Sequence, residues 1–372
     1  MKVEAFISVK EGNILEAVRE FLAGLLKEGI VDYLLVPEAM AGGQTQAPSL
    51  IKDPAFLAKA NPFSPVMPEN TASVVSRLTA DNPGKKLGVV LRPCEIRALI
   101  ELVKLNQANL ESVTIIGIDC LGTVEVEDYA KFIKEGDGSA VEKEALILSE
   151  LKHNIEKPSE AKLSVSLRPA CNMCVYFTPT LADITLSLYG IENGISVNLE
   201  DSLAKQLKLE VKEHPARQKA AKSLLGTRKA EREKVLQTYR DKTKTVVDFA
   251  DDLSTCIRCY ACSSACPVCY CRTCFFKTDT FKPESERYYR WADKEGALRM
   301  PTETLLYHLT RMNHVGASCI SCGMCESACP RNIPLTTIFA AVADSVQKTL
   351  EYTAGKSLDD KIPLSSIRPE GA

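Results

Sequence analysis

The sequence predicts an α/β N-terminal domain, built on a mixed sheet with flanking helices, followed by a mainly helical C-terminal domain. Two observations predict this division. Residues 1 to about 135 alternate strand-like and helix-like segments, which is the rhythm of a sheet flanked by helices. The C-terminal part instead carries two matching cysteine runs, separated by a 52-residue insert with a helix-like segment.

The strand and helix patterns follow one another in order. Short strands are expected at residues 6–9, 33–36, 87–91 and 113–118. A helix is expected over residues 13–27, where Asn13 suits the N-cap, and another over residues 94–105, where Pro93 suits the first turn. Residues 139–158 predict a further helix, and a strand-rich stretch continues to about residue 199. There is no GxGxxG sequence, so the standard dinucleotide-binding fingerprint is absent.

Length and composition describe an ordinary globular protein. The chain has 372 residues, enough for two or three domains, with 45% hydrophobic and 25% charged residues and a net charge of −2. These values give no reason to expect a nucleic acid partner. No apolar run approaches the roughly 18 residues of a membrane span, and the N-terminus lacks the apolar core of a signal peptide. We therefore expect a cytoplasmic protein.

The cysteine content indicates metal binding. Fifteen cysteines in a chain without an export signal favour metal over disulfides. Two runs share the pattern C-x2-C-x2-C-x3-C-P, which holds iron–sulfur clusters. The fourth cysteine of such a run, just before the proline, reaches the partner cluster. We therefore expect two [4Fe–4S] clusters, one held by Cys256, Cys259, Cys262 and Cys329, and the other by Cys319, Cys322, Cys325 and Cys266. Because such clusters are oxygen-labile, they suit an anaerobe. Zinc, which also accepts four cysteines, is the alternative.

The spacing of the two runs predicts a ferredoxin-like domain that is mainly helical. The insert between Cys266 and Cys319 is long for a compact two-cluster ferredoxin. It contains a predicted helix at residues 301–313, with Leu305, Leu306, His308 and Leu309 near one face, and residues 335–352 predict a second helix. His308 and His314 are interpreted as packing or surface residues. Arg258 is a candidate for tuning the cluster potential, but an ordinary surface charge is the preferred interpretation.

Seven further cysteines fall into two groups. Cys269, Cys271 and Cys274 follow the first run closely, and they either bind a metal of their own or pack beside the cluster and donate weak S–H bonds to it. The packing interpretation is preferred because no fourth ligand is evident. The second group lies in the N-terminal half, where two members follow predicted strand ends and two form a CxxC pair. These four cysteines could bind either a third [4Fe–4S] cluster or a structural zinc. Its members are Cys94, Cys120, Cys171 and Cys174.

A basic segment separates the two halves. Residues 212–244 contain eleven Lys and Arg against four Asp and Glu, and they predict a long helix that is interrupted near Gly226. The segment is interpreted as a solvated helix or linker, or else as a docking surface for an acidic partner. The expected divisions are an α/β domain over residues 1–210, a basic helical linker over 211–250, the two-cluster domain over 251–352 and a tail over 353–372.

Three segments resemble the beta subunits of coenzyme F420-reducing hydrogenase and F420-dependent formate dehydrogenase. They are residues 92–96 (RPCEI), residues 116–120 (IGIDC), and the stretch from Cys171 to Ile184 with its CxxC, Phe-Thr and Ala-Asp-Ile elements. The resemblance covers roughly residues 70–200. It implies FAD, for which Pro93, Phe177, Thr178 and Asp183 are the candidate binding residues, and it favours a third cluster at the N-terminal cysteines.

The resemblance also implies a role. Such subunits pass electrons between clusters and a soluble two-electron carrier, so we expect a partner that is the catalytic subunit of a hydrogenase, a formate dehydrogenase or a heterodisulfide-reductase-like complex. F420, NAD(P) and ferredoxin all stay open as carriers. Two positions depart from the family: Tyr176 replaces an acidic residue, and Ser187 replaces a glycine. They motivate an alternative, a conduit without flavin. The segment CPVCYC also resembles electron-transfer subunits of sulfur-reducing hydrogenases and sulfite reductases.

Overall fold

The computed structural model describes residues 1–9, 13–81, 84–156, 162–271, 273–281, 285–296 and 303–363. Two units divide the chain. The first comprises Met1–Glu233 with Gly355–Asp360, and the second comprises Lys234–Ala354 with Lys361–Ala372. The first unit is an α/β fold and the second is mainly helical, so the predicted fold class is confirmed. The four-part division expected from the sequence stays a prediction.

One eight-stranded mixed sheet organises the first unit. Its strands lie in the order β3-β2-β4-β5-β6-β7-β1-β8. The bounds are β1 Lys2–Ser8, β2 Tyr33–Ala39, β3 Gln46–Ile51, β4 Leu87–Leu91, β5 Val113–Ile118, β6 Ile184–Ser187, β7 Gly194–Glu200 and β8 Glu210–Val211. The four central strands β2, β4, β5 and β6 are parallel, and the remaining pairs are antiparallel.

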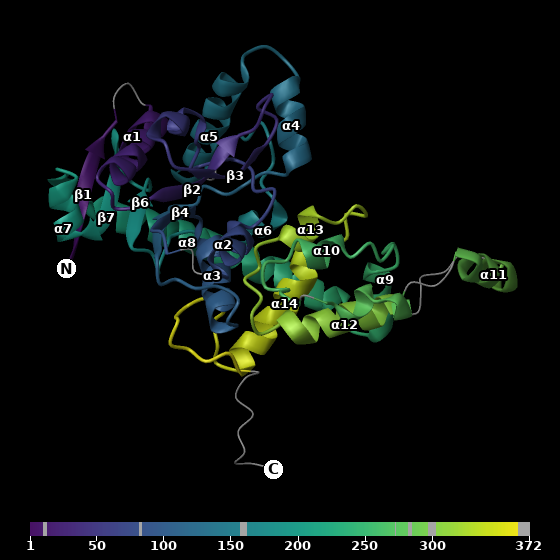
Figure 1. Ribbon diagram of the computed structural model, residues 1–372. Coiled ribbons are helices and arrows are strands. Elements are labelled where there is room, and N and C mark those ends of the chain that lie inside the picture. The colour runs from purple at the N-terminus through teal and green to yellow at the C-terminus, as the bar shows by residue number, and fades with distance from the viewer. Residues whose placement is uncertain are drawn as a thin grey trace. The chain divides into compact units, whose positions relative to one another are not determined.

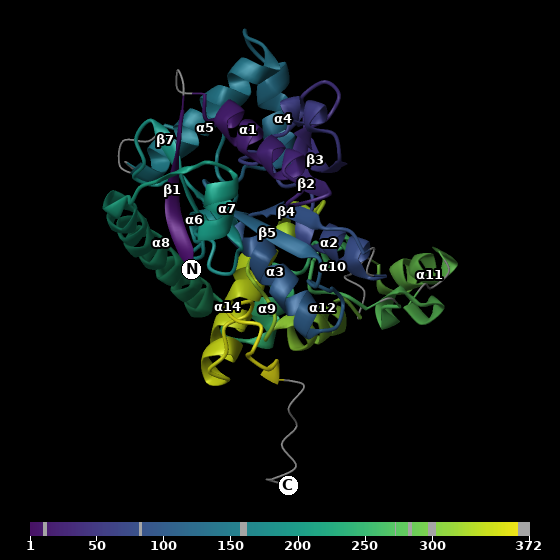
Figure 2. The ribbon, with the colours of Figure 1, turned by 60° about the vertical axis from the view of Figure 1, so that its left-hand side comes forward.

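Helices cover both faces of this sheet. In Figures 1 and 2, α1 and α5 lie on one side of the strands and α2 and α3 on the other. The helices of this unit are α1 Ile14–Lys27, α2 Thr71–Thr79, α3 Pro93–Lys104, α4 Val126–Lys134, α5 Ala140–Glu156, α6 Pro169–Asn172 and α7 Asp201–Gln206, with a 3-10 turn at Pro54–Lys59. Asn13 caps α1 as expected, because its side-chain oxygen accepts the Glu16 amide at 3.1 Å.

Parallel pairing brings two cysteines to one edge of the sheet. β4 and β5 run in register, with Leu91 opposite Gly117. Cys94 follows the carboxyl end of β4 and Cys120 follows that of β5. Ligand sites in open α/β sheets gather at these strand ends. The topology therefore agrees with the prediction of a ligand site at the edge that carries Cys94 and Cys120.

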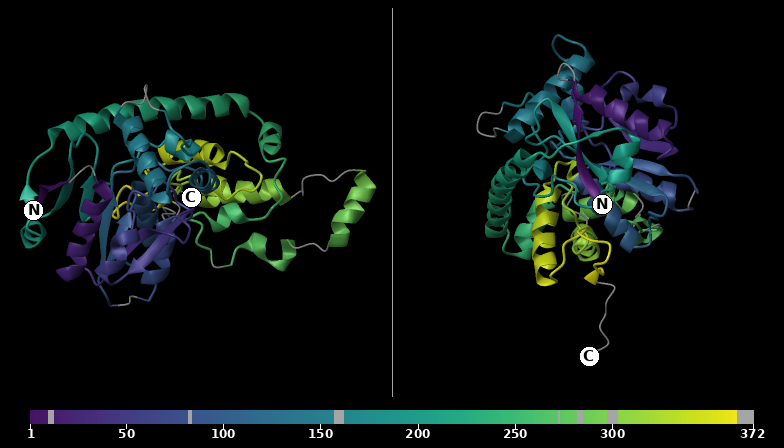
Figure 3. Two further views of the ribbon diagram at one scale, coloured as in Figure 1. Left: turned by 90° about the horizontal axis from the view of Figure 1, so that it is seen from above. Right: turned by 90° about the vertical axis from the view of Figure 1, so that its left-hand side faces the viewer.

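The basic segment forms one helix. α8 spans Pro215–Lys242 without a break at Gly226, and Figure 3 shows it as a single rod. The expected interruption is therefore wrong. Gly226 is exposed, and a methyl group added there would meet nothing within 4 Å, so this glycine only weakens the helix locally.

The second unit consists of helices joined by cysteine-bearing loops. The helices that follow α8 are α9 Val246–Asp252, α10 Ala261–Ser264, α11 Ser285–Glu295, α12 Glu303–Val315, α13 Met324–Ser327 and α14 Leu335–Thr349, with 3-10 turns at Phe275–Lys277 and Asp279–Phe281. Its apolar core includes Tyr307, Ile338 and Phe339, and half-buried cysteines of both runs pack against it. The core therefore surrounds the thiols directly.

Close packing around Gly117 gives a stability test. An added Cβ there would lie 2.6 Å from the Pro179 Cβ and 2.9 Å from the Ala182 Cβ. We expect Gly117→Ala to destabilise the protein by about 1–3 kcal/mol through overpacking. The matched Gly226→Ala change in α8 should instead stabilise by about 0.5–1 kcal/mol. Anaerobic thermal unfolding followed by circular dichroism measures both, and equal effects of the two changes would contradict this account.

Candidate functional site

Two loops with the same backbone hold the C-terminal cysteines. Between its first three cysteines, each run has left-handed residues at corresponding places: Arg258 (φ 53°) and Tyr260 (φ 61°) in the first, Ser321 (φ 56°) and Gly323 (φ 78°) in the second. This conformation costs energy outside glycine, so its repetition indicates that each loop is held by what it wraps. Both loops lead into a short helix, α10 or α13.

Each loop wraps a separate cavity, and each cavity receives one cysteine from the other run. The cavity of the first run, named cavity A, leaves about 320 Å³ unfilled by protein atoms, and that of the second run, named cavity B, about 410 Å³. The thiols that line cavity A belong to Cys256, Cys259, Cys262 and Cys329. The thiols that line cavity B belong to Cys266, Cys319, Cys322 and Cys325. The structure thus brings together the two sets that the spacing predicts, while their binding of clusters stays a prediction.

Burial makes these thiols hard to ionise alone. It raises the pKa of Cys256, Cys266 and Cys325 above the ordinary thiol value, and the charge of neighbouring thiols in the same set raises it further. Thiolates gathered in this way need a cationic centre to hold them. The donor set therefore fits iron–sulfur chemistry, in which each thiolate is bound to iron.

Helix α12 supplies polar contacts to cavity A. The Tyr307 hydroxyl lies 3.5 Å from the Cys262 Sγ, and the His308 Nε2 lies 3.4 Å from the Cys256 Sγ. Burial, together with the nearby Arg311 charge, lowers the pKa of His308 to about 4, so its imidazole is neutral at neutral pH. A neutral ring with its proton on Nε2 donates to the sulfur.

Arg311 donates to one of these two sulfur atoms. Its Nη1 lies 3.0 Å from the Cys262 Sγ, and its Nη2 donates to the Cys262 carbonyl at 3.2 Å. Its side chain also lines cavity B. Tyr307 and Arg311 are not among the residues that the cysteine motifs indicate, although their i, i+4 spacing on one helix face was a usable signal.

The structure adds to one sequence interpretation of this region and corrects another. Of the residues expected near one face of the helix, Leu306 and Leu309 are exposed; the buried face of α12 carries Tyr307, His308 and Arg311, because this face meets thiols as well as apolar side chains. Arg258 is not an ordinary surface charge: it is buried, and its Nη1 lies 3.5 Å from the Glu303 carboxylate.

The N-terminal cysteines gather partly around the edge of the sheet. Burial raises the pKa of Cys120 to about 12; the Arg92 charge opposes this rise, while nearby Cys171 and Cys174 add to it. Gly122, whose φ is +94°, lets Leu167 approach the backbone closely, since an added Cβ there would lie 2.7 Å from the Leu167 Cδ2. The Thr123 amide points to the Cys171 Sγ at 3.4 Å.

The segment after the CxxC pair is built into this edge. The Phe177 carbonyl accepts the Cys120 amide at 2.8 Å, and its ring packs on Tyr189. Tyr176, where the resemblance leads us to expect an acidic residue, lies under the Arg97 guanidinium at 3.6 Å from the ring centroid. A carboxylate at this place would pair with Arg97 by charge, so the tyrosine substitutes a cation–π contact.

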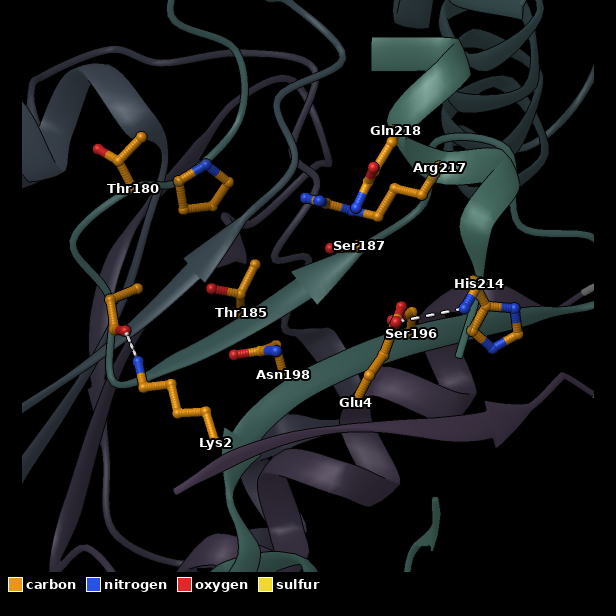
Figure 4. Close-up of a pocket in the computed structure, with 12 residues that line it drawn as sticks. Lys2, Glu4, Thr180, Thr185, Ser187, Ser196, Asn198, His214, Arg217 and Gln218 are labelled. Carbon is orange, nitrogen blue, oxygen red and sulfur yellow. Dashed lines mark hydrogen bonds between the residues drawn. The ribbon is translucent and has the colours of Figure 1, made fainter. Parts of the chain in front are cut away.

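A polar pocket lies beside this edge in the same unit (Figure 4). It is open to solvent and leaves about 870 Å³ between protein atoms. Strands β1, β6 and β7, the loop before β6 and the start of α8 line it, through residues that include Lys2, Glu4, Thr180, Thr185, Ser187, Ser196, Asn198, His214 and Arg217. Figure 4 shows Arg217 and Gln218 reaching from α8 toward Ser187. Because these residues are far apart in sequence, no local sequence motif predicts the pocket.

Arg217 joins this pocket to the cysteine edge. Its Nη2 lies 3.0 Å from the Asp119 Oδ1, and Asp119, which is fully buried, immediately precedes Cys120. The Leu188 and Tyr189 amides also donate to Asp119. Burial raises the pKa of Asp119 to about 6, while Arg217 and these amides limit the rise.

The four residues expected to bind FAD lie at different places. Thr178 is next to Pro179 and Thr180, which line the pocket. Pro93 is buried at the start of α3. The Asp183 carboxylate accepts the Ile115 amide at 2.7 Å and so ties β6 to β5. Their role in cofactor binding stays a prediction.

The three remaining cysteines lie near one another. Burial raises the pKa of Cys269, and the Arg311 charge opposes the rise, while Cys271 and Cys274 add to it. Within the described ranges, no cluster of three or more His, Cys, Asp or Glu side chains has an arrangement that could hold a single metal ion. The choice between packing and metal binding for these cysteines stays open.

Comparisons with known families agree with both halves of the fold. Residues 84–206 match the family described as the C terminus of the coenzyme F420 hydrogenase/dehydrogenase beta subunit. Residues 252–333 match the 4Fe-4S dicluster domain. The fold and these matches define an iron–sulfur oxidoreductase of the electron-transport type. The resemblance that the sequence indicated is therefore confirmed: residues 84–206 are similar to the coenzyme F420 hydrogenase/dehydrogenase beta subunit, and residues 252–333 are similar to a 4Fe–4S dicluster module.

Two curated relatives match along nearly their whole length. The F420-dependent formate dehydrogenase subunit beta of Methanocaldococcus jannaschii is 27% identical, with 93% of each chain covered. The F420-dependent formate dehydrogenase 1 subunit beta of Methanococcus maripaludis is 26% identical, with 95% of this chain and 94% of the relative covered.

A solved structure is also similar. A chain of the F420-reducing [NiFe] hydrogenase complex from Methanosarcina barkeri aligns with a TM-score of 0.42 and 14% identity, over 66% of this chain and 93% of that chain. Among the described residues, no helix has the length and apolar character needed to cross a membrane.

The Asp119–Arg217 pair gives a second stability test. We expect Arg217→Met to destabilise the natural protein more than it destabilises an Asp119→Asn background, with a coupling of about 0.5–3 kcal/mol, because it leaves a buried carboxylate without its cation. Anaerobic urea denaturation of the four proteins gives the coupling. The exposed Arg77–Glu69 pair is the control and should couple by about 0–1 kcal/mol. Equal coupling of the two pairs would contradict the role of burial.

Proposed function

We propose that this protein is an electron-transfer subunit that carries two [4Fe–4S] clusters in its C-terminal unit and exchanges electrons with a soluble two-electron carrier. One observation carries the proposal: two cavities, each lined by three thiols of one run and one thiol of the other. This exchange of the fourth ligand is the arrangement of two-cluster ferredoxins. The match to a dicluster domain favours clusters over zinc.

We further propose a third [4Fe–4S] cluster at the N-terminal edge of the sheet. Cys120, Cys171 and Cys174 lie within electrostatic reach of one another there, and Cys94 follows the adjacent parallel strand. Arg92 supplies a positive charge near Cys120, which suits a site made of thiolates. The match of residues 84–206 to the C terminus of the coenzyme F420 hydrogenase/dehydrogenase beta subunit also supports a redox centre in this domain.

The polar pocket is the proposed place of the flavin, FAD. Its lining includes Pro179, two residues after Phe177. Hydroxyl, amide and charged side chains also line it, which suits a ligand with ribityl and phosphate groups. Arg217 and the start of α8 are suited to a phosphate. When bound, a flavin takes up two electrons as hydride and releases them singly. The chain's own residues orient the ligand and place it beside the cysteine edge.

The proposed partner is a catalytic subunit. The two curated relatives are named as beta subunits of F420-dependent formate dehydrogenases, and such naming implies further subunits. A formate dehydrogenase or hydrogenase catalytic subunit therefore fits best, and F420 fits best as the carrier. An alternative is a conduit without flavin, favoured by Ser187: its buried side chain lines the pocket wall at the position where the resemblance leads us to expect glycine.

Iron and sulfide counts test the number of clusters. Protein purified anaerobically should contain about twelve irons, because three four-iron sites are proposed, whereas about eight would remove the N-terminal site. Cys120→Ser should lower the count by about four. Cys271→Ser, which changes an exposed thiol outside the three sets, should leave it unchanged. A protein that folds without iron would refute the proposed function.

Flavin extraction tests the pocket. The natural protein should release about one FAD per chain, the usual stoichiometry of a single flavin site. Thr185→Phe should lower this value severalfold, since it places a ring inside the pocket shown in Figure 4. The control is Thr227→Phe, the same enlargement on the exposed surface of α8. A natural protein with full iron content and no flavin would favour the conduit instead.

A further inference from the structure

We propose that Arg311 is a single buried cation shared by both C-terminal cluster sites, which makes both reduction potentials more positive and acts most strongly at cavity A. This inference rests on the proposed function, because it requires clusters in both cavities. It assigns to one side chain of α12 a task that neither the cysteine motif nor the family match describes.

Arg311 lies between the two thiol sets. Its guanidinium donates to Cys262, which belongs to the set of cavity A, through both a 3.0 Å contact to Sγ and a 3.2 Å contact to the carbonyl. The same side chain lines cavity B, and its charge acts on the thiols of Cys266 and Cys325 there. One cation therefore faces both sets.

The positive charge of Arg311 is also buried. Arg311 is 4% exposed, and among the described residues no carboxylate forms an ion pair with it. Its guanidinium instead lies over the rings of Phe339, at 4.6 Å, and Tyr307, at 5.5 Å. A charge so deeply buried is costly unless anions surround it, and clusters held by four thiolates are such anions.

The neighbouring groups show that the cationic role belongs to Arg311. Arg258 is also buried, but the Glu303 carboxylate at 3.5 Å offsets its charge. His308 contacts Cys256 only through Nε2, and Tyr307 contacts Cys262 only through its hydroxyl, so neither brings a guanidinium to the sulfur. Arg331 lines cavity A too, but it is exposed, so water screens it.

The physical consequence follows from charge. Reduction adds an electron to a cluster, and a nearby buried cation stabilises this extra negative charge. Hydrogen bonds to the ligand sulfurs act in the same direction. Arg311 contributes both effects at cavity A and at least the charge at cavity B.

The test is an EPR-monitored redox titration of the anaerobic holoprotein. Arg311→Met keeps much of the side-chain length among the aromatic rings but removes the charge. We expect both midpoint potentials to become more negative, with about a tenfold lower ratio of reduced to oxidised cluster at fixed potential for cavity A, or 59 mV for one electron. Cavity B should shift less. Cys259→Ser, which alters an exposed ligand of cavity A, identifies the signal of that site.

Two further variants make the result decisive. Arg331→Met is the matched control and should shift the potentials much less. Arg311→Lys keeps the charge but loses the two-nitrogen contact to Cys262, so it should retain most of the potential at cavity B and less at cavity A. Shifts no larger than those of Arg331→Met would overturn the inference, as would loss of both clusters in both Arg311 variants, which would mark a purely structural role. Absence of clusters from the natural protein would instead refute the proposed function.

Discussion

The gathering of largely buried thiols around two cavities is the constraint on which the second unit depends. A thiol ionises with difficulty in a buried place, and several thiolates close together repel one another. Cys256, Cys266 and Cys325 all show this effect in their raised pKa values. The unit is therefore organised for inorganic cations in its centre, and the helices pack around the loops that carry the thiols. Left-handed backbone at Arg258 and Tyr260 is part of the same adaptation.

The first unit uses a different construction. The edge of its sheet that carries cysteines depends on parallel pairing of β4 with β5, which places Cys94 and Cys120 after neighbouring strands. Asp119 then connects this edge to the polar pocket, because its carboxylate accepts from Arg217 on α8. A ligand that engages Arg217 would therefore act on the residue next to Cys120, which gives a physical link between pocket and cysteines within one sheet.

Much of this organisation was predictable because its signals are local. The C-x2-C-x2-C-x3-C-P spacing indicated both thiol sets, including the exchange of Cys266 and Cys329, and the apolar runs indicated β4 and β5. Contacts made by long-range packing were not predictable. No pattern in the sequence predicts that Arg258 is buried. The buried face of α12 is also less apolar than its exposed face, because Leu306 and Leu309 face solvent while Arg311 and His308 face thiols. The pocket likewise draws Lys2 and His214 from opposite ends of the first unit.

Iron anomalous scattering from anaerobically grown crystals tests the central claim most directly, because it locates each metal atom relative to the cysteine sulfurs. The account predicts a four-iron group in each C-terminal cavity, bonded to three cysteines of one run and to the fourth cysteine of the other, Cys329 in cavity A and Cys266 in cavity B. Single metal ions at these places, or four-iron groups bonded only by cysteines of one run, would contradict it.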